Sequence, residues 1–281
     1  MEQQQNWGAG LHNFRQVTPQ AEELPFQARE AINVLRGNIQ LSGYDLKVIA
    51  ITSARPNEGK SSVAFRLARS LAALGKKTIY VDCDIRNSEV MARYEIQQSV
   101  CGLSEFLCGR VTINDIIYCT DNQFMDMIFT GAVAPNPSEL VSGPLFVQLL
   151  DDLKKNYDYV IVDTPPVNPV IDGALIAKKC DGTVLVVECG FTERAQAVKA
   201  KRQLEYAGIK ILGVVLNKVG LSKKGYGYGY GYGYGYGYGY GYGYGYGYGE
   251  KNTKAAKKKA AKAAKAAKKE KPARDKKRTR A

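Results

Sequence analysis

The sequence predicts an α/β fold in which a mostly parallel β-sheet is flanked by helices, followed by a disordered C-terminal tail. Short runs rich in Val and Ile alternate with amphipathic stretches along residues 22–222. This alternation implies right-handed βαβ crossovers and a sheet covered on both faces. Beyond residue 222 the chain is first a Gly-Tyr repeat and then a Lys/Ala-rich segment, and neither contains the branched aliphatic side chains that a core needs.

Net charge divides the chain at the same point. The formal net charge is +13, but residues 1–222 hold 23 Lys and Arg against 24 Asp and Glu, whereas residues 250–281 hold 15 against 3. Any affinity for a polyanion therefore belongs to the tail. We expect a polar arm at 1–21, a folded domain at 22–222, a Gly-Tyr tract at 223–249 and a basic tail at 250–281.

The folded domain begins with a helix and continues with strands and helices in turn. Residues 22–41 carry apolar side chains at near-helical spacing, from Leu24 to Ile39. We expect strands at 46–52, 76–82, 157–163, 182–188 and 210–217, and helices at 61–74, 170–179 and 193–206. The stretch 85–142 is harder to interpret, although MDMIF at 125–129 favours one more strand.

Composition argues against two classes of protein. No apolar run approaches the roughly 18 residues of a membrane span, and the polar start MEQQQNWGAG is unlike a signal peptide, so we expect a cytoplasmic protein. The six cysteines include no CxxC pair, and His12 is the one histidine in the chain, which argues against zinc and against a disulfide framework. We expect the thiols to be reduced and mostly buried.

A phosphate-binding loop follows the first of these strands. ARPNEGKSS places the GKS of the GxxxxGK[ST] pattern at a strand-to-helix turn, with Ala54 where the pattern has its first glycine. Backbone N–H groups and the helix dipole would cradle phosphates, Lys60 would reach the β/γ oxygens, and the Ser61 hydroxyl would ligate Mg²⁺. The pattern indicates a phosphate-binding loop of the P-loop NTPase kind that binds nucleotide phosphates and Mg²⁺, the alternative being an incidental lysine at a solvated helix start. The candidate residues are Ala54, Asn57, Glu58, Gly59, Lys60, Ser61 and Ser62.

Three aspartates lie at the ends of two further hydrophobic strands. Asp82 and Asp84 occur in IYVDCDIR, and Asp163 ends VIVD, before two prolines turn the chain away. The carboxyl ends of parallel strands share one edge, so all three would lie beside the phosphate loop. Asp163 and one of the Asp82/Asp84 pair would hold Mg²⁺, and the other would accept a proton from an attacking hydroxyl. The alternative is that these aspartates only cap the next helices.

In these motifs the chain resembles the bacterial tyrosine kinases (BY-kinases) of exopolysaccharide and capsule biosynthesis, of the cytoplasmic CpsD/CapB-like type. The likeness covers about residues 25–221: SARPNEGKSS matches the Walker A motif, IYVDCDIR the family's additional Walker A′ motif and VIVDTPPV its Walker B motif. APNPSELVS at 134–142 looks like the loop that precedes the Walker B strand. LNK at 216–218 looks like the segment that contacts the nucleotide base.

The resemblance implies ATP- and Mg²⁺-dependent autophosphorylation of a C-terminal tyrosine cluster, which would regulate polysaccharide synthesis or export. Asp82 would be the proton acceptor and would also match a magnesium position. Arg86 would steady phosphate charge or Asp84, and Asn217 would contact the adenine edge. The positions matched to phosphate binding, magnesium and catalysis are Lys60, Ser61, Asp82, Asp84 and Asp163.

The resemblance also implies partners. The family's interface helix usually reads like EAFRTLRTNI, whereas here EAINVLRGNI keeps Glu30 and Arg36 but has Asn33 in place of the first arginine. A ring-like homo-oligomer is expected, with one ion-pair donor fewer per interface. A separate membrane-anchored modulator of the polysaccharide co-polymerase type would activate the kinase and recruit it to the inner face of the cell membrane.

The Gly-Tyr tract departs from the short, irregular tyrosine cluster of the family. A Gly-rich linker of about 25 residues spans on the order of 25–30 Å, which would let many tyrosines reach a neighbouring subunit's site. Gly-Tyr repeats also self-associate, so adhesion is an alternative or additional role. The tract holds twelve of the 19 tyrosines, and these expected phosphoacceptors are Tyr226, Tyr228, Tyr230, Tyr232, Tyr234, Tyr236, Tyr238, Tyr240, Tyr242, Tyr244, Tyr246 and Tyr248.

The basic tail has three candidate partners, namely nucleic acid, an anionic membrane face and an acidic polymer. A solvated end without a partner is the alternative. Each phosphotyrosine brings about −1.5 to −2 charges, so roughly six to eight phosphates on the tract would neutralise the tail's positive charge. We therefore expect a charge switch, in which phosphorylation weakens polyanion binding.

Two other functions stay open at this stage. A MinD/ParA-like partitioning ATPase would use the basic tail to attach to a nucleoid or membrane surface. Such ATPases carry an extra lysine early in a KGGxGK-type loop, where this chain has Ala54 and Arg55, so the kinase is favoured. The third candidate is a catalytically idle nucleotide-binding scaffold that self-associates through the Gly-Tyr tract.

Overall fold

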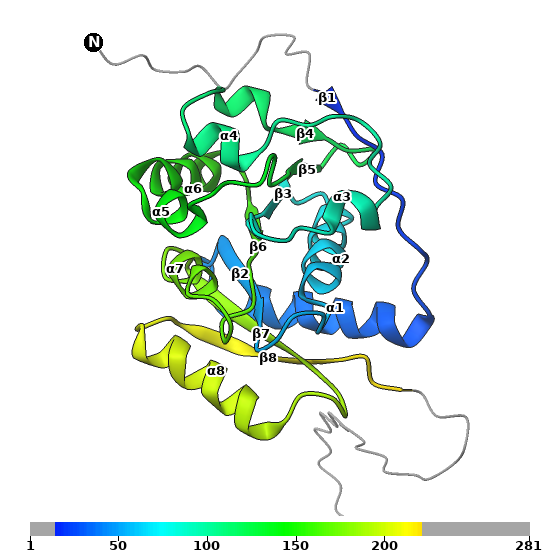
Figure 1. Cartoon of the computed structure of the whole chain (residues 1–281). Coiled ribbons are helices and arrows are strands. Elements are labelled where there is room, and N and C mark those ends of the chain that lie inside the picture. The colour runs from blue at the N-terminus through cyan, green and yellow to red at the C-terminus, as the bar shows by residue number, and fades with distance from the viewer. Residues whose placement is uncertain (1–14, 221–281) are drawn as a thin grey trace, which may run out of the picture. The chain divides into compact units, whose positions relative to one another are not determined.

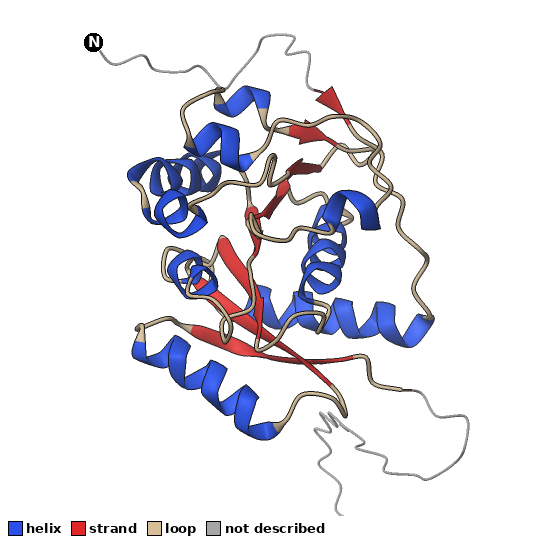
Figure 2. Cartoon of the chain, viewed as in Figure 1, coloured by secondary structure: helices blue, strands red, loops and turns tan. Residues whose placement is uncertain are grey.

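Residues 15–220 of the 281-residue chain are described by the structure, a computed structural model. These residues build an eight-stranded sheet with helices on both faces (Figures 1 and 2). The Gly-Tyr tract and the basic tail lie outside the described residues, so the disorder expected for them stays a prediction.

The sheet has the strand order β1-β4-β5-β3-β6-β2-β7-β8. Neighbouring strands pair in parallel except β4 and β5, which are antiparallel. The α/β fold with a mostly parallel sheet is therefore confirmed. The strands are β1 Arg15–Gln16, β2 Val48–Ser53, β3 Thr78–Asp82, β4 Tyr118–Cys119, β5 Met125–Ile128, β6 Tyr159–Asp163, β7 Gly182–Glu188 and β8 Ile211–Asn217.

Both faces of the central strands are buried, because alternate side chains enter different cores. In β2, Ile49 and Ile51 pack with residues of α1 and α2, whereas Val48 and Ala50 pack on the opposite face with residues of α4, α6, α7 and α8. The helices are α1 Phe26–Leu41, α2 Lys60–Ala72, α3 Val90–Arg93, α4 Leu103–Leu107, α5 Pro137–Ser142, α6 Pro144–Asn156, α7 Asp172–Ala177 and α8 Arg194–Tyr206, with a 3₁₀ turn, η1, at Ile113–Asp115.

Some element boundaries differ from the sequence expectation. The first helix begins at Phe26 and not at residue 22, because Pro25 precedes it with an extended backbone and disfavours helical geometry in the residue before it. MDMIF does form a strand, β5. The helices in the stretch 85–142 have at most six residues, too few for a helical period to be visible in sequence.

Two expectations about membranes and thiols can be compared with residues 15–220. Within this range no helix combines the length and the apolar character that crossing a bilayer requires. All six cysteines are free thiols, but Cys83 alone is buried, while the other five are half-buried or exposed. The expectation of mostly buried thiols is therefore wrong.

Asp181 joins the starts of β2 and β7. Its Oδ2 accepts hydrogen bonds from the backbone N–H groups of Lys47 (3.0 Å) and Val48 (2.9 Å), and its Oδ1 pairs with the Lys154 ammonium. Burial acts to raise the pKa of Asp181, but the Lys154 bond and the two N–H donors outweigh it and lower this pKa. A carboxyl group with a lowered pKa stabilises the fold at pH values above its unfolded pKa.

The Asp181→Asn substitution is expected to lower the free energy of unfolding by about 1 kcal/mol at pH 7, because Lys154 loses its charge-assisted hydrogen bond. The difference from the wild type should disappear as pH falls through the lowered pKa of Asp181, below its ordinary value near 3.9, since both proteins are then uncharged there. Urea denaturation of both proteins at neutral and acidic pH measures this difference in the free energy of unfolding. Asp152→Asn, at a partly exposed helix pair with Lys155, is the control, and a pH-independent difference for Asp181→Asn would contradict the expectation.

Candidate active site

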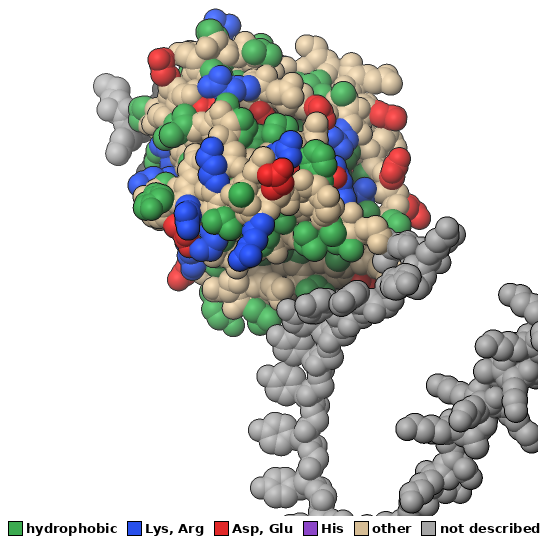
Figure 3. All heavy atoms as spheres, turned by 60° about the horizontal axis from the view of Figure 1, so that its bottom comes forward, with side chains coloured by type: hydrophobic (Ala, Val, Ile, Leu, Met, Phe, Trp, Pro, Cys, Tyr) green, Lys and Arg blue, Asp and Glu red, His purple; other side chains and the backbone are tan. Residues whose placement is uncertain are grey.

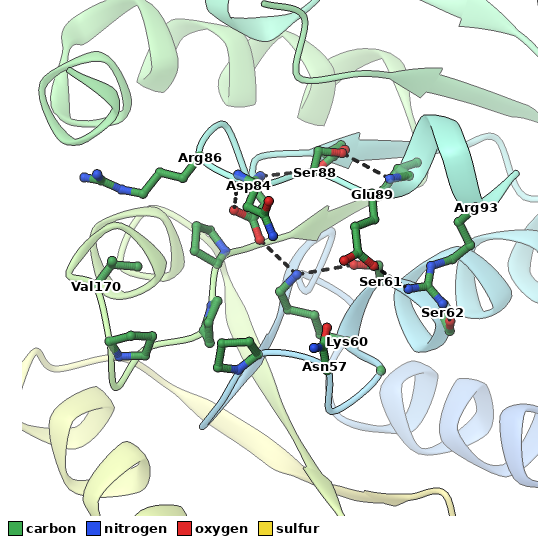
Figure 4. Close-up of a pocket in the computed structure, with 18 of the residues that line it drawn as sticks. Asn57, Lys60, Ser61, Ser62, Asp84, Arg86, Ser88, Glu89, Arg93 and Val170 are labelled. Atoms are coloured by element: carbon green, nitrogen blue, oxygen red, sulfur yellow. Dashed lines mark hydrogen bonds and ion pairs between the residues drawn. The ribbon is translucent and has the colours of Figure 1, made fainter. Parts of the chain in front are cut away.

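A cavity of about 590 Å³ lies at the carboxyl edge of the sheet. The phosphate loop, the segment after β3 and the end of β8 contribute to its walls. Figure 4 shows Lys60 pointing toward Ser61 and Asp84 within it. The predicted phosphate and carboxylate residues thus converge, because β2, β3 and β6 are adjacent and parallel and end on the same side.

The phosphate loop enters α2 through two residues in left-handed conformation. Asn57 has a φ of 65° and Gly59 a φ of 89°, and Lys60 is the first residue of the helix. A Cβ on Gly59 would lie 2.1 Å from the amide nitrogen of Asn217, so the position requires glycine. The first turn of α2 lines the cavity, and its unpaired N–H groups are suited to bind phosphate.

Glu58 holds the phosphate loop from inside the protein. Its side chain is fully buried. One carboxylate oxygen accepts a hydrogen bond from Arg55 N at 2.8 Å, and the other accepts one from the Thr192 hydroxyl. Both carboxylate oxygens are thus directed at protein donors, and these contacts tie Glu58 to the backbone of the loop and to the segment after β7.

The end of β8 holds the same loop. The Asn217 amide donates to Glu58 O at 2.9 Å, and the Lys218 ammonium donates to Asn57 O at 2.6 Å. Asn217 was expected to contact adenine, and it does line the cavity, but its amide N–H is engaged by the loop. We call Glu58, Thr192, Asn217 and Lys218 the loop clamp. A glutamate within an anion-binding loop was the only signal of it in the sequence.

A Glu58→Ala variant is expected to raise the KM for ATP and to lower the free energy of unfolding by about 1–3 kcal/mol, because the buried Arg55 N–H and Thr192 hydroxyl lose their acceptor. Turnover at saturating ATP should change less than KM, since Glu58 does not reach the reacting atoms. Steady-state kinetics and urea denaturation measure both effects, with the surface variant Glu23→Ala as control. An unchanged KM would show that the clamp does not shape the loop.

Lys60 lies between carboxylates. Its ammonium is 3.1 Å from Asp84 Oδ2 and 4.0 Å from Asp163 Oδ1, and it donates to Ser61 Oγ at 3.3 Å (Figure 4). Burial acts to lower the pKa of Lys60, but the attraction of Asp163 and Asp84 outweighs it and raises the pKa. Lys60 is therefore a fixed positive charge in the cavity.

Asp82 is a buried carboxyl group with a nearly neutral pKa. Its oxygens accept hydrogen bonds from Asp84 N at 3.2 Å and from the Ser88 hydroxyl. Burial and the repulsion of Asp163 raise the pKa of Asp82 to about 7 in spite of these bonds. A pKa near the working pH suits a group that accepts a proton and later returns it.

Asp163 is the residue that best fits a metal ion. The Tyr80 hydroxyl donates to its Oδ2 at 2.9 Å, whereas its Oδ1 is buried and has no hydrogen-bond partner among the described residues. Mg²⁺ prefers such oxygen ligands and keeps several waters. Within residues 15–220 no group of three or more His, Cys, Asp or Glu side chains could by itself hold a metal.

Arg86 points away from the phosphate loop (Figure 4). Its guanidinium pairs with the buried Asp172 at the start of α7 and donates to Ser138 Oγ at 3.1 Å, and Ser138 in turn donates to Asp172. Among the described residues no hydrogen bond or ion pair joins Arg86 to Asp84. The other expected role of Arg86, toward phosphate charge, stays a prediction, since Arg86 lines the cavity. Arg86 connects the segment after β3 to α5 and α7, and through Ser138 the APNPSELVS motif contacts a residue that lines the cavity.

The other candidate residues lie in three places. Ala54 is buried, whereas Asn57 and Ser62 line the cavity. Glu30 and Arg36 lie on α1: Arg36 donates to Ser70 O at 3.0 Å and to Ser70 Oγ at 2.7 Å, and Glu30 accepts from the Asn33 amide at 2.9 Å. The twelve expected phosphoacceptors lie outside the described residues.

Known proteins resemble this chain in sequence and in fold. Residues 46–193 match a family model described as an AAA domain. The chain is 41% identical over 200 residues to the tyrosine-protein kinase CpsD of Streptococcus agalactiae, an alignment that covers 71% of this chain and 87% of that protein.

Two solved structures bear on the fold. The kinase domain of Escherichia coli tyrosine kinase ETK matches with a TM-score of 0.65 and 31% identity, over 74% of this chain and 87% of that one. The cell division ATPase MinD of Pyrococcus furiosus matches with a TM-score of 0.54 and 23% identity, over 63% of this chain and 74% of that one. The second likeness is one of fold alone.

Proposed function

This chain belongs to the bacterial tyrosine-protein kinases, which have the P-loop NTPase fold, and we propose that it uses ATP and Mg²⁺ to phosphorylate its own Gly-Tyr tract. The chain is thus a protein-tyrosine kinase, the function that its sequence motifs favoured. The partitioning ATPase is the less supported alternative.

The main support for the proposal is that the chain leaves the folded domain beside the cavity. Asn217 and Lys218 line the cavity, and the tract begins at Gly225. An extended chain covers at most about 3.6 Å per residue, so Tyr226 is tethered within about 29 Å of Lys218, and each later Gly-Tyr pair extends this reach by about 7 Å. The tract is therefore long enough to bring tyrosines to this cavity, and in the proposed homo-oligomer the same length would serve the cavity of a neighbouring copy.

The side chains of the cavity would divide the work of phosphoryl transfer. Lys60 and the loop N–H groups would bind the phosphates, and bound Mg²⁺, held through Ser61, Asp82 and Asp163, would neutralise charge on the transferring group. Asp82 would accept the proton of the tyrosine hydroxyl, and Asp84 would orient Lys60. Asn217 would contact the base from the rim.

Phosphates on the tract are the expected result of incubation with Mg-ATP. Peptide mass analysis should locate them between Tyr226 and Tyr248, and replacing these twelve tyrosines by Phe should remove them. An inactive Lys60→Met chain that keeps its tract, mixed with active chain carrying the Phe tract, tests transfer between copies. Phosphate on the inactive chain indicates transfer in trans. ATP hydrolysis with an unmodified tract would contradict the proposal and favour the ATPase.

Regulation would involve other copies and a membrane partner. We propose that a membrane-anchored modulator activates this cytoplasmic kinase and holds it at the inner face of the membrane, where it regulates capsule or exopolysaccharide synthesis or export. A ring-like homo-oligomer would bring the tract of one copy to the next. Since Arg36 bonds Ser70 and Glu30 bonds Asn33 within the chain, ring contacts through them would replace these bonds. Kinase assays with and without the modulator's cytoplasmic segment test the activation.

The basic tail would provide a charge switch. Its 15 Lys and Arg against 3 Asp and Glu would bind a polyanion such as nucleic acid, an anionic membrane or an acidic polymer. About six to eight phosphotyrosines in the tract would cancel this charge and reduce the dependence of binding on salt. Equal binding of phosphorylated and unphosphorylated protein to a polyanion across a salt titration would rule the switch out.

A further inference from the structure

The sheet ends in two edge strands of different character. β1, at one edge, has two residues, one of them Arg15. β8, at the other edge, has seven residues, ILGVVLN, with no charge and no proline. Short length, charges and prolines are the usual devices that keep an edge strand from pairing with another chain. β8 has none of the three. Figure 3, which turns the bottom of Figure 1 forward, shows hydrophobic side chains interspersed with Lys, Arg, Asp and Glu on that face of the domain.

The free edge of β8 offers backbone groups for a further strand. β8 pairs in parallel with β7, and Asn217 O accepts a hydrogen bond from Cys189 N at 2.9 Å. Because the N–H and C=O groups of successive residues point to opposite sides of a strand, those of Val214 and Leu216 point to the free edge. Their side chains are 59% and 56% exposed, so this edge is both unpaired among the described residues and apolar.

We propose that the start of this chain's own Gly-Tyr tract docks on β8 as an antiparallel strand. The tract is the next segment of the chain: residues 218–224 separate β8 from Gly225. Seven residues span up to about 23 Å, enough to reverse direction and cross the roughly 4.8 Å between paired strands. The clamp contacts of Asn217 and Lys218 hold the start of this turn in place.

The repeat of the tract matches the period of a strand. Side chains alternate between the two faces of a strand, so the tyrosines all lie on one face and the glycines on the other. Val214 and Leu216 lie on one face of β8 and offer an exposed apolar surface to tyrosine rings. Val215 packs toward the core of α1 and α2, and glycines add no side chain on that face. A seven-residue strand accommodates about the first three tyrosines, which leaves the others free.

Amide hydrogen exchange of the full-length, nucleotide-free protein tests the docking. In a variant with Tyr226, Tyr228 and Tyr230 replaced by Ser, the Val214 and Leu216 amides are expected to exchange at least about tenfold faster than in the wild type. The sequence of the folded domain is unchanged in this variant. Equal exchange rates in the two proteins would overturn the proposal. Because no ATP is present, this failure would leave the proposed phosphorylation of the tract unaffected.

A proline on the edge provides a second test. Val214→Pro removes an N–H that points away from β7, so the β7–β8 pairing is preserved. We expect it to abolish the exchange protection of residues 225–231, while Val214→Thr, which retains the N–H group, keeps it. Protection that Val214→Pro leaves intact would overturn the docking.

A second copy of the chain is the competing occupant of this edge. Protection of the Val214 and Leu216 amides that is independent of protein concentration supports docking of the chain's own tract. Protection that increases with concentration, together with a dimer in light scattering that Val214→Pro abolishes, would overturn it and assign the edge to β8 of a second copy.

Discussion

A Lys60→Met variant is expected to keep the fold and to lose autophosphorylation by a factor of about 10²–10³ or more. Lys60 is the charge at the centre of the cavity, 3.1 Å from Asp84 and 4.0 Å from Asp163. Removing a fixed charge that stabilises the transferring phosphate usually lowers the rate by about this factor. Its removal also leaves the two carboxylates facing the phosphates without a counter-charge.

Initial rates of phosphate incorporation at saturating Mg-ATP measure the loss, and binding of nucleotide by calorimetry separates affinity from turnover. Lys155→Met is the matched control, because Lys155 is 72% exposed and pairs only with Asp152 on the helix surface. Circular dichroism verifies that both variants are folded. An autophosphorylation rate within a few-fold of the wild type would remove Lys60 from the mechanism.

An Asp82→Asn variant is expected to lose turnover by about 10²–10⁴-fold, the usual contribution of a general base. Asparagine has the same shape and can still accept the hydrogen bond from Asp84 N, so the site should keep its conformation. Affinity for Mg-ATP should fall as well, because Asp82 is also one of the proposed magnesium ligands, and the rates are therefore compared at saturating Mg-ATP. The chemical step is lost because an amide cannot take the tyrosine proton. Single-turnover rates with Mg-ATP measure the effect, and Asp84→Asn is the comparison that distinguishes the proton acceptor from the residue that orients Lys60. A variant with normal single-turnover rates would exclude Asp82 as the base.

The same substitution is expected to stabilise the metal-free protein. Burial and Asp163 raise the pKa of Asp82 from 3.8 to about 7, so the folded state binds a proton that the unfolded state has lost between these values. The wild type therefore loses stability as pH rises from about 4 to about 7. Asn has no such charge, and the melting temperature of Asp82→Asn should exceed that of the wild type increasingly over this range. Thermal melts in EDTA measure it, and equal melting temperatures at pH 8 would contradict it.

Much of the candidate site could be predicted because its residues lie at the ends of recognisable strands. IYVD, VIVD and the strand before the phosphate loop are short, apolar and bounded by turns, so parallel pairing was expected and brought Asp82, Asp163 and Lys60 to one edge. Those placements are confirmed by the sheet order. The roles of the three residues in phosphoryl transfer remain predictions.

The partners of other site residues could not be predicted. Glu58 is 134 residues from Thr192 and 159 from Asn217, and Arg86 is 86 residues from Asp172. No local pattern marks which of several distant polar groups will meet when loops from different strands pack together. The sequence assigned Arg86 to phosphate charge or to Asp84, and Asn217 to the adenine edge. It did not predict the contacts of Arg86 with Asp172 and Ser138, or those of Asn217 in the loop clamp.

The sequence by itself determined the fold class, the order of the central elements, the location of the phosphate loop and the family. These follow from local periodicity and from motifs whose geometry is set within a few residues. Tertiary structure alone decided the pairing of Glu58, Arg86 and Asn217, the raised pKa of Asp82 and the unprotected edge of β8. Each of these depends on burial and on contacts between segments far apart in the chain. Bringing such segments together costs conformational entropy, and local composition does not show which segments will meet.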